Sequence, residues 1–191
     1  MPVVELLAKD HRALEKLLTT LGETSSQVPD ERIELFSQLQ TLLQAHSRAE
    51  EEVVYRRLRL REPEEVKVLE AFEEHHIADI LLQELASACP GGAGWAAKVK
   101  VLEEMLRLHI REEELQLFAL LKANFDNAEL AQMGREFKAL KHERIESLLG
   151  PLRRATPAFA GRAAITAQAA AGRYLRRGEL FMLHRLGQLR A

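Results

Sequence analysis

The stretches His46-Ser-Arg-Ala-Glu50 and His109-Ile-Arg-Glu-Glu113 decide the fold of this chain, because they repeat a His-x-x-x-Glu pair. A histidine precedes each pair by 35 or 34 residues, at His11 and at His75. Residues four apart share one face of an α-helix and lie about 6 Å apart along its axis. The spacing therefore predicts two helical hairpins that bring metal ligands to one level of a helical bundle.

The histidines and glutamates of this pattern lie on the apolar face of each predicted helix, in series with steps of three and four residues. The four series are Leu7, His11, Leu14, Leu18, Leu21; Leu39, Leu43, His46, Glu50, Val53; Val68, Phe72, His75, Asp79, Leu82, Ala86; and Leu102, Leu106, His109, Glu113, Leu117, Leu120. A lone core histidine is more often a hydrogen-bonded packing residue than a metal ligand. Ionised carboxylates buried without partners are costly, so their recurrence in phase on four helices favours a bound cation over a dense hydrogen-bond network.

Three stretches around these residues resemble the hemerythrin-like HHE cation-binding domain family. They are His46 to Tyr55, Glu74-His75-His76 with Leu81 to Leu85, and His109 to Phe118. The resemblance covers about residues 3 to 123 and implies an all-α fold, an up-down-up-down four-helix bundle. It also implies two non-haem iron ions with an oxo, hydroxo or water bridge. Iron is preferred over manganese or zinc on this resemblance, since mixed histidine and carboxylate ligation alone fits all three metals.

Carried over residue by residue, the resemblance implies that Glu50 and Glu113 bridge the two ions. Asp79 stands four residues after His75, where oxygen-carrying hemerythrins have a histidine. A carboxylate is a harder donor than an imidazole, so we expect Asp79 either to bind the metal or to orient a neighbouring imidazole. The expected metal-site residues are His11, His46, Glu50, His75, Asp79, His109 and Glu113.

Two ambiguities concern the neighbours of these residues. His76 adjoins His75, but its side chain points about 100° away from the seam, so His75 is favoured. Glu51 and Glu114 directly follow the motif glutamates and are expected on the solvated surface. The oxygen carriers place their last carboxylate five residues after the histidine, which keeps Glu114 as an alternative ligand.

The resemblance implies a protein that binds or reduces a small oxidant, such as O2, peroxide or NO, or that senses iron or oxygen. Peroxidase-like, catalase-like and NO- or O2-reactive activities all fit, whereas Asp79 argues against reversible oxygen carriage. The alternative is a regulatory module whose metal state controls the binding of a partner or of nucleic acid. The sequence holds no Ser-His-Asp or Cys-His nucleophile arrangement and no phosphate-binding glycine-rich loop.

Composition and the positions of proline and glycine predict the domains and helices of the chain. The single cysteine, Cys89, excludes an intramolecular disulfide, and with no signal or membrane segment we expect a cytoplasmic protein. We expect a metal-binding bundle over residues 1–125 and a helical extension over residues 126–191, with one helix before a break at Gly150-Pro151 and another after about Pro157. The four bundle helices are expected over Val3–Leu21, Pro29–Leu60, from Pro63 to the loop at Pro90–Gly94, and Trp95–Ala123.

The end of the chain is basic. Residues 151–191 contain eight arginines and one glutamate, a net charge of +7, which leaves −9 for residues 1–150. Three interpretations compete: the extension packs on the bundle or forms a homodimer contact, it meets nucleic-acid phosphates, or it binds a membrane surface or a regulatory protein. No recognised DNA-binding motif surrounds the arginines.

Overall fold

The computed structural model describes residues 1–24, 29–63 and 65–155, and all the regular secondary structure in this part of the chain is helical. The expected all-α class is therefore confirmed. The elements are α1 (Val3–Glu23), α2 (Pro29–Glu50), η1 (Glu51–Tyr55), α3 (Arg56–Arg61), α4 (Val66–Ser87), α5 (Ala93–Glu112), η2 (Glu113–Leu117), α6 (Phe118–Asn124) and α7 (Asn127–Ala155).

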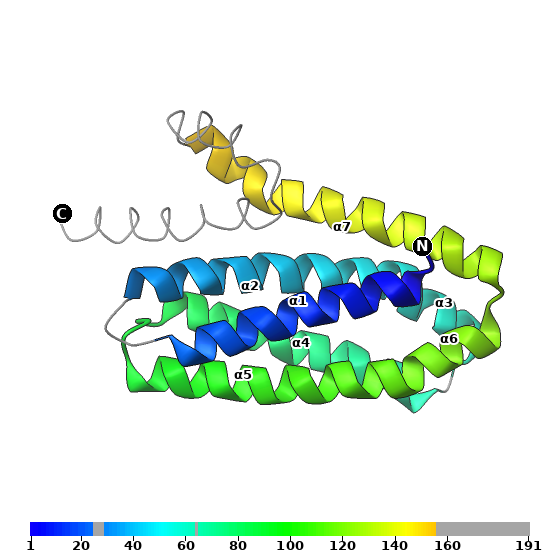
Figure 1. Ribbon diagram of the computed structural model, residues 1–191, viewed down its shortest axis with the longest axis horizontal. Coiled ribbons are helices and arrows are strands. Elements are labelled where there is room, and N and C mark those ends of the chain that lie inside the picture. Colours follow the sequence, from blue (N-terminus) through cyan, green and yellow to red (C-terminus); the bar gives the residue numbers. More distant parts are fainter. Residues whose placement is uncertain (25–28, 64, 156–191) are drawn as a thin grey trace.

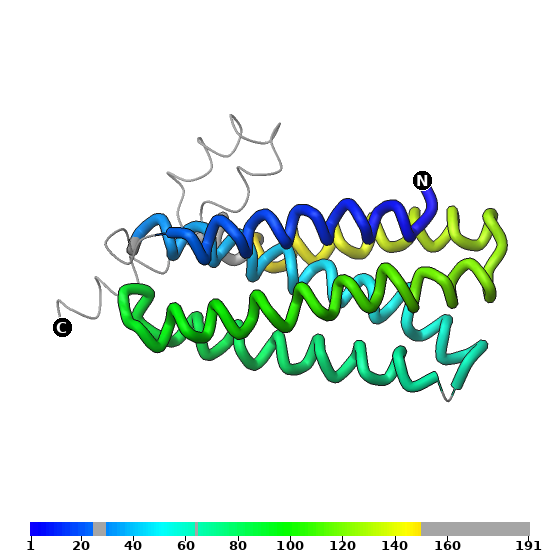
Figure 2. Tube along the Cα trace, turned by 60° about the horizontal axis from the view of Figure 1, so that its bottom comes forward, coloured from blue at the N-terminus to red at the C-terminus, as the bar shows by residue number. Residues whose placement is uncertain are grey.

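Four long rods lie side by side, formed by α1, by α2 with its continuation η1 and α3, by α4, and by α5 with its continuation η2 and α6 (Figure 1). Successive rods run in opposite directions. The fifth rod, α7, lies along α1 and α2 on the outside of this group, and the turned view keeps the same neighbours (Figure 2). The helix beyond the four rods therefore covers the α1–α2 face and leaves the α4–α5 face uncovered by α7.

Two expected boundaries differ from the structure by more than two residues. The third rod begins at Val66 rather than at Pro63, because the Glu65 side chain accepts a hydrogen bond from the backbone N–H of Lys67 (3.2 Å) and so caps the helix. The predicted break at Gly150-Pro151 is wrong, since α7 continues to Ala155. A proline removes one helical hydrogen bond but can bend a helix without ending it. The predicted helix after Pro157 lies outside the described residues.

The core has two large apolar clusters with a polar layer between them, and a third, small cluster joins Ala45 of α2 to α7. On α1, Val3 and Leu7 belong to one cluster, and Leu14 and Leu18 belong to the other. His11 lies between them and is fully buried. The first cluster also takes in Phe137 of α7, whereas the second closes the opposite end of the bundle. The polar layer is therefore isolated from water on both sides along the bundle axis.

Two of the rods contain a π-helical turn beside the polar layer. The turn η1 follows directly after Glu50, and the turn η2 begins at Glu113. A π-helical turn inserts one extra residue into a helix and is frequent at functional sites. Three consecutive side chains of η1, those of Val53, Val54 and Tyr55, are buried.

The seam of α4 also differs from the expected series. The buried residues of this helix are Val68, Ala71, His75, Ala78, Leu82 and Leu85. Positions three and four residues after His75 both lie near the buried face. Packing places Ala78 inward, and the side chain of Asp79 is 25% exposed.

Candidate metal centre

Six of the seven side chains expected at the metal site lie together in the polar layer. Each of these residues is between 0 and 3% exposed. They come from all four rods, so the site depends on the packing of the whole bundle. We call them the six centre residues, and they are His11, His46, Glu50, His75, His109 and Glu113.

Glu50 lies between two imidazoles. Its Oε2 atom is 3.3 Å from Nε2 of His46, one helical turn earlier on α2. The same oxygen is 3.8 Å from Nε2 of His75, which belongs to α4. One carboxylate therefore faces an imidazole from each of the two hairpins.

Glu113 repeats this arrangement from the other side. Its Oε2 atom is 3.3 Å from Nε2 of His11 on α1 and 3.4 Å from Nε2 of His109 on α5. The Nε2 atoms of His75 and His109 are 3.2 Å apart. Oxygens and nitrogens of the six centre residues thus converge on one small volume.

Several of these converging atoms have no hydrogen-bond partner. Among the described residues, Nε2 of His11 and Oε2 of both Glu50 and Glu113 are buried and unpartnered. Ligand atoms of these three residues and of His46 all lie within 4.8 Å of one another. Leaving buried polar atoms unsatisfied is costly, and a cation among them would satisfy all of them at once. The donor set therefore fits a metal ion.

Electrostatics support the same interpretation. Burial lowers the pKa of His46, but the charge of Glu50 and the hydrogen bond to Asp10 outweigh it and raise the pKa to about 10. Burial raises the pKa of Glu113, but the positive charges of His109, His11 and His75 outweigh it, so this pKa is well below its usual range. The site therefore attracts positive charge, which a proton or a metal ion can supply.

A second layer of carboxylates surrounds the imidazoles, one for each Nδ1 atom. The pairs are Asp10 with His46 (3.4 Å), Glu51 with His75 (3.1 Å), Glu74 with His109 (2.7 Å), and Glu114 with His11 (3.0 Å). We call Asp10, Glu51, Glu74 and Glu114 the carboxylate ring. A carboxylate on Nδ1 fixes the ring orientation and leaves Nε2 free as a ligand, the usual arrangement around metal-bound histidines.

Each carboxylate of the ring pairs with an imidazole on a neighbouring rod. Asp10 of α1 serves α2, Glu51 of the second rod serves α4, Glu74 of α4 serves α5, and Glu114 of the fourth rod serves α1. Each ring carboxylate is also the chain neighbour of a centre residue. The expectation that Glu51 and Glu114 are merely solvated surface residues is therefore wrong. Sequence reasoning missed the ring because a helical period links positions within one rod, whereas these pairs cross between rods.

Asp79 is not brought to the centre. Its Oδ2 atom accepts a hydrogen bond from Nη2 of Arg48 (3.0 Å), and Nη1 of Arg48 also binds Glu51 (2.9 Å). Asp79 therefore contacts the site through Arg48 and the carboxylate ring. The neighbouring His76 is exposed, whereas His75 is buried.

Aromatic side chains enclose the centre. The hydroxyl of Tyr55, which is fully buried, donates a hydrogen bond to Oε1 of Glu113. The Tyr55 ring also stacks on His75, with centroids 5.4 Å apart. Phe118 stacks on His11 at 6.0 Å. Tyr55 thus leaves Oε2 of Glu113 as the oxygen that faces the imidazoles.

The helix α7 reaches the carboxylate ring. The Nζ atom of Lys141 lies 2.6 Å from both carboxylate oxygens of Asp10. The Phe137 ring meets the His46 ring edge-on, with centroids 5.8 Å apart. Burial raises the pKa of Asp10, but the hydrogen bond from His46 and the charges of His46 and Lys141 outweigh it, so this pKa is lowered. A residue outside the four rods thereby holds the carboxylate that orients His46.

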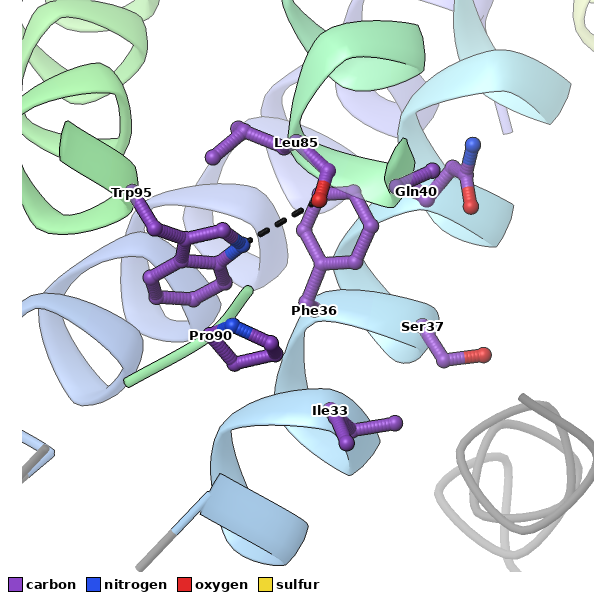
Figure 3. Close-up of a pocket in the computed structure, with 8 residues that line it drawn as sticks. Ile33, Phe36, Ser37, Gln40, Leu85, Pro90 and Trp95 are labelled. Carbon is purple, nitrogen blue, oxygen red and sulfur yellow. Dashed lines mark hydrogen bonds between the residues drawn. The ribbon is translucent and has the colours of Figure 1, made fainter. Parts of the chain in front are cut away.

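The end of the bundle that the second apolar cluster fills contains a largely apolar pocket. The pocket is lined by Ile33, Phe36, Leu85 and Trp95, among other residues (Figure 3). The Trp95 indole N–H donates to the carbonyl oxygen of Leu85 (3.2 Å), which anchors the ring. None of the six centre residues lines this pocket. It therefore belongs to the packing of the helix ends rather than to the metal site.

Comparison with known proteins agrees with this geometry. The model of the hemerythrin HHE cation binding domain matches residues 3–121, more than half of the chain. The protein therefore belongs to the hemerythrin HHE cation-binding domain family, which confirms the resemblance read from the sequence. The match ends before α7, so Lys141 lies outside it.

A curated relative is the protein named DNA nickase from Nostoc sp. (strain PCC 7120 / SAG 25.82 / UTEX 2576). It is 31% identical over 150 residues, which are 78% of this chain and 42% of the relative. The chain thus spans less than half the length of that relative. No solved structure matches. Within the described residues, no helix is long and apolar enough to cross a membrane.

Proposed function

We propose that this protein holds two iron ions in the buried centre and that it binds, reduces or senses a small oxidant there. The proposal rests mainly on one observation. Four imidazoles, each with Nδ1 on a carboxylate, turn Nε2 toward two glutamates whose inward oxygens are unpartnered. Iron is preferred over manganese or zinc because of the family to which the chain belongs.

The proposed ligand set is the six centre residues. His11 and His46 have ring centroids 5.2 Å apart, and those of His75 and His109 are 4.9 Å apart. The pair His11 and His46 would hold one ion, and the pair His75 and His109 would hold the other. Glu50 and Glu113 each lie between one imidazole of each pair, which suits carboxylates that bridge two ions. Asp79, as the partner of Arg48, is left out of this set.

The burial of the six centre residues limits the size of the molecule that can reach them. The six centre residues are at most 3% exposed, so a polymer or a large metabolite does not reach them in this structure. A diatomic molecule or peroxide is small enough to follow a narrow path. When bound, the iron pair would supply electrons to such an oxidant. The protein would supply a dry cavity and fixed imidazole orientations, which the carboxylate ring provides.

The test is anaerobic reconstitution with ferrous iron. We expect two iron ions per chain and a change in the visible spectrum when O2, peroxide or NO is added. Catalytic turnover of peroxide would identify an enzyme, and a single slow oxidation would identify a sensor. Glu113→Ala should bind less iron, while Glu104→Ala on the exposed surface of α5 serves as the control. A protein that binds no iron would contradict the proposal.

A second candidate function is nicking of DNA, which the name of the Nostoc relative suggests. The net charge of +7 over residues 151–191 suits contact with phosphates. The buried centre does not admit a DNA strand, so nicking there would need a small diffusible oxidant. Incubation of supercoiled plasmid with iron-loaded protein tests this. Nicks that a radical scavenger suppresses and that Glu113→Ala abolishes would support it, and intact plasmid would exclude it.

A further inference from the structure

A narrow crevice between α4 and α5 leads from the surface to the metal centre. His109 and Glu113 form its inner end. Three more carboxylates line it, and the exposed fraction of their side chains increases outward: 21% for Glu74, 31% for Glu112 and 44% for Glu70. Larger hollows beside Trp95, Ser87 and Phe125 contain none of the six centre residues. The crevice thus offers a graded series of oxygen ligands.

Glu113, which lines the inner end of the crevice, has an unpartnered oxygen. Among the described residues, Oε2 of Glu113 has no hydrogen-bond partner, and the residue is 2% exposed. This observation distinguishes the crevice from an ordinary acidic surface patch. The buried carboxylate at its inner end favours positive charge, whereas Glu70 and Glu112 at its outer end are partly exposed to solvent.

Glu74 differs from the other three carboxylates of the ring. Lys141 lies against Asp10, Arg48 against Glu51, and Arg12 is 3.8 Å from Glu114. Within the described part of the chain, Glu74 has His109 as its ion-pair partner and no lysine or arginine. The ring carboxylate that lines the crevice is therefore the one without a permanent cation.

A single ammonium group closes the mouth. Nζ of Lys67 lies 2.7 Å from Oε2 of Glu70 and 2.9 Å from Oε2 of Glu112, so it joins α4 to α5. The three side chains are 31–44% exposed. Ion pairs at such positions are weak and are screened by salt, so this link opens readily. The charges of the four outer groups that line the crevice, Glu70, Glu74, Glu112 and Lys67, sum to −2.

We propose that this crevice is the route by which the divalent metal cation reaches the centre, with Glu70, Glu112 and Glu74 as successive transient ligands and Lys67 as the ammonium that the cation displaces. The inference rests on the proposed metal centre. A negative cleft with low-dielectric walls attracts cations and raises their rate of association. A divalent ion replaces the single charge of the ammonium and then meets the unpartnered oxygen of Glu113.

The test measures the rate of metal uptake. Metal-free full-length protein is mixed with Co2+, and the visible ligand-field bands are followed in time, as is cobalt release into a chelator. Lys67→Met removes the ammonium and keeps the aliphatic stem. The matched control is Lys98→Met, because Lys98 pairs with Glu84 and also joins α5 to α4, but outside the crevice. The double variant Glu70→Gln with Glu112→Gln removes two charges from the mouth.

We expect Lys67→Met to speed uptake and release by about two- to tenfold, and the double variant to slow uptake by a similar factor. The final cobalt count and spectrum should be unchanged in both. Lys98→Met should behave as the wild type. Equal rates for Lys67→Met and Lys98→Met, or rates that follow the global unfolding rate of each variant, would overturn the route. A wild-type protein that binds no cobalt or iron would contradict the proposed centre itself.

Discussion

The His46 side and the His109 side of the centre use the same chemistry in different surroundings. Both imidazoles hold Nδ1 against a carboxylate, Asp10 or Glu74. Asp10 is 7% exposed and is held by Lys141 of α7, whereas Glu74 lines a crevice that opens to the surface. Equal spacing in the sequence thus produces the same pair of residue types on both sides but unequal exposure to solvent. The His46 side is enclosed and held by an ammonium group, whereas the His109 side faces a crevice.

The largest effect is expected at the shared centre. Glu113→Ala removes a carboxylate that faces both His11 and His109. We expect the iron count to fall from two per chain to one or none, and Glu50→Ala to behave similarly. Elemental analysis after anaerobic loading measures the count. An unchanged count in both variants would show that the bridging ligands are other residues.

Metal removal should destabilise the whole described bundle, because the centre residues come from all four rods. At a free metal concentration 1,000 times the dissociation constant, binding to the folded form alone contributes about 4 kcal/mol. Thermal unfolding with and without the metal measures this difference. Equal melting temperatures at saturating metal would contradict a site that exists only in the folded protein.

A change in α7 should strongly affect the stability and metal affinity of the His46 side of the centre. Lys141→Met leaves Asp10 buried without its ammonium, and we expect a loss of about 1.5–3 kcal/mol in the free energy of unfolding. We also expect metal affinity to fall by about tenfold, since the partner of His46 is no longer held. The control is Lys138→Met, one turn earlier on the exposed face of α7. If the two variants bind metal equally, Lys141 has no role in the centre.

The pKa of His46 predicts opposite pH dependences for the metal-free and metal-bound forms. It is raised from 6.5 to about 10, so its stabilising effect in the metal-free protein is complete below about pH 6.5 and is lost as pH rises toward 10. Metal binding requires the deprotonated imidazole and releases this proton. Stabilisation by metal should therefore grow between pH 6.5 and 9. Thermal unfolding of both forms across this range measures it, and a pH-independent difference would count against His46 as a ligand.

The smallest effect is expected at Asp79. Its partner Arg48 has a half-exposed side chain, and such ion pairs contribute about 0–1 kcal/mol. Asp79→Ala should therefore leave the metal count unchanged and alter stability only slightly. Elemental analysis and thermal unfolding measure both quantities. Loss of a metal ion in this variant would restore Asp79 as a ligand.

Periodicity could predict the helices and the inward direction of His11, His46, Glu50 and Glu113, because positions within one rod repeat regularly. It could not choose between Ala78 and Asp79, since both lie close to the face of His75 and packing decides between them. The π-helical turns were also beyond it, because an extra residue such as that in η1 leaves no simple repeat. Contacts between rods, such as Glu74 with His109, depend on the order and rotation of the helices, which a single period does not contain.

The carboxylate ring has a consequence for how the chain selects one topology. Each rod gives a carboxylate to the next imidazole in a fixed direction around the bundle. If the same four rods assembled in the opposite sense, their leucine seams would still pack, but the four Nδ1 atoms would face the wrong neighbours. Buried polar groups without partners penalise that mirror arrangement. The ring thus lets polar residues distinguish the native order of helices from an alternative that hydrophobic packing alone would tolerate.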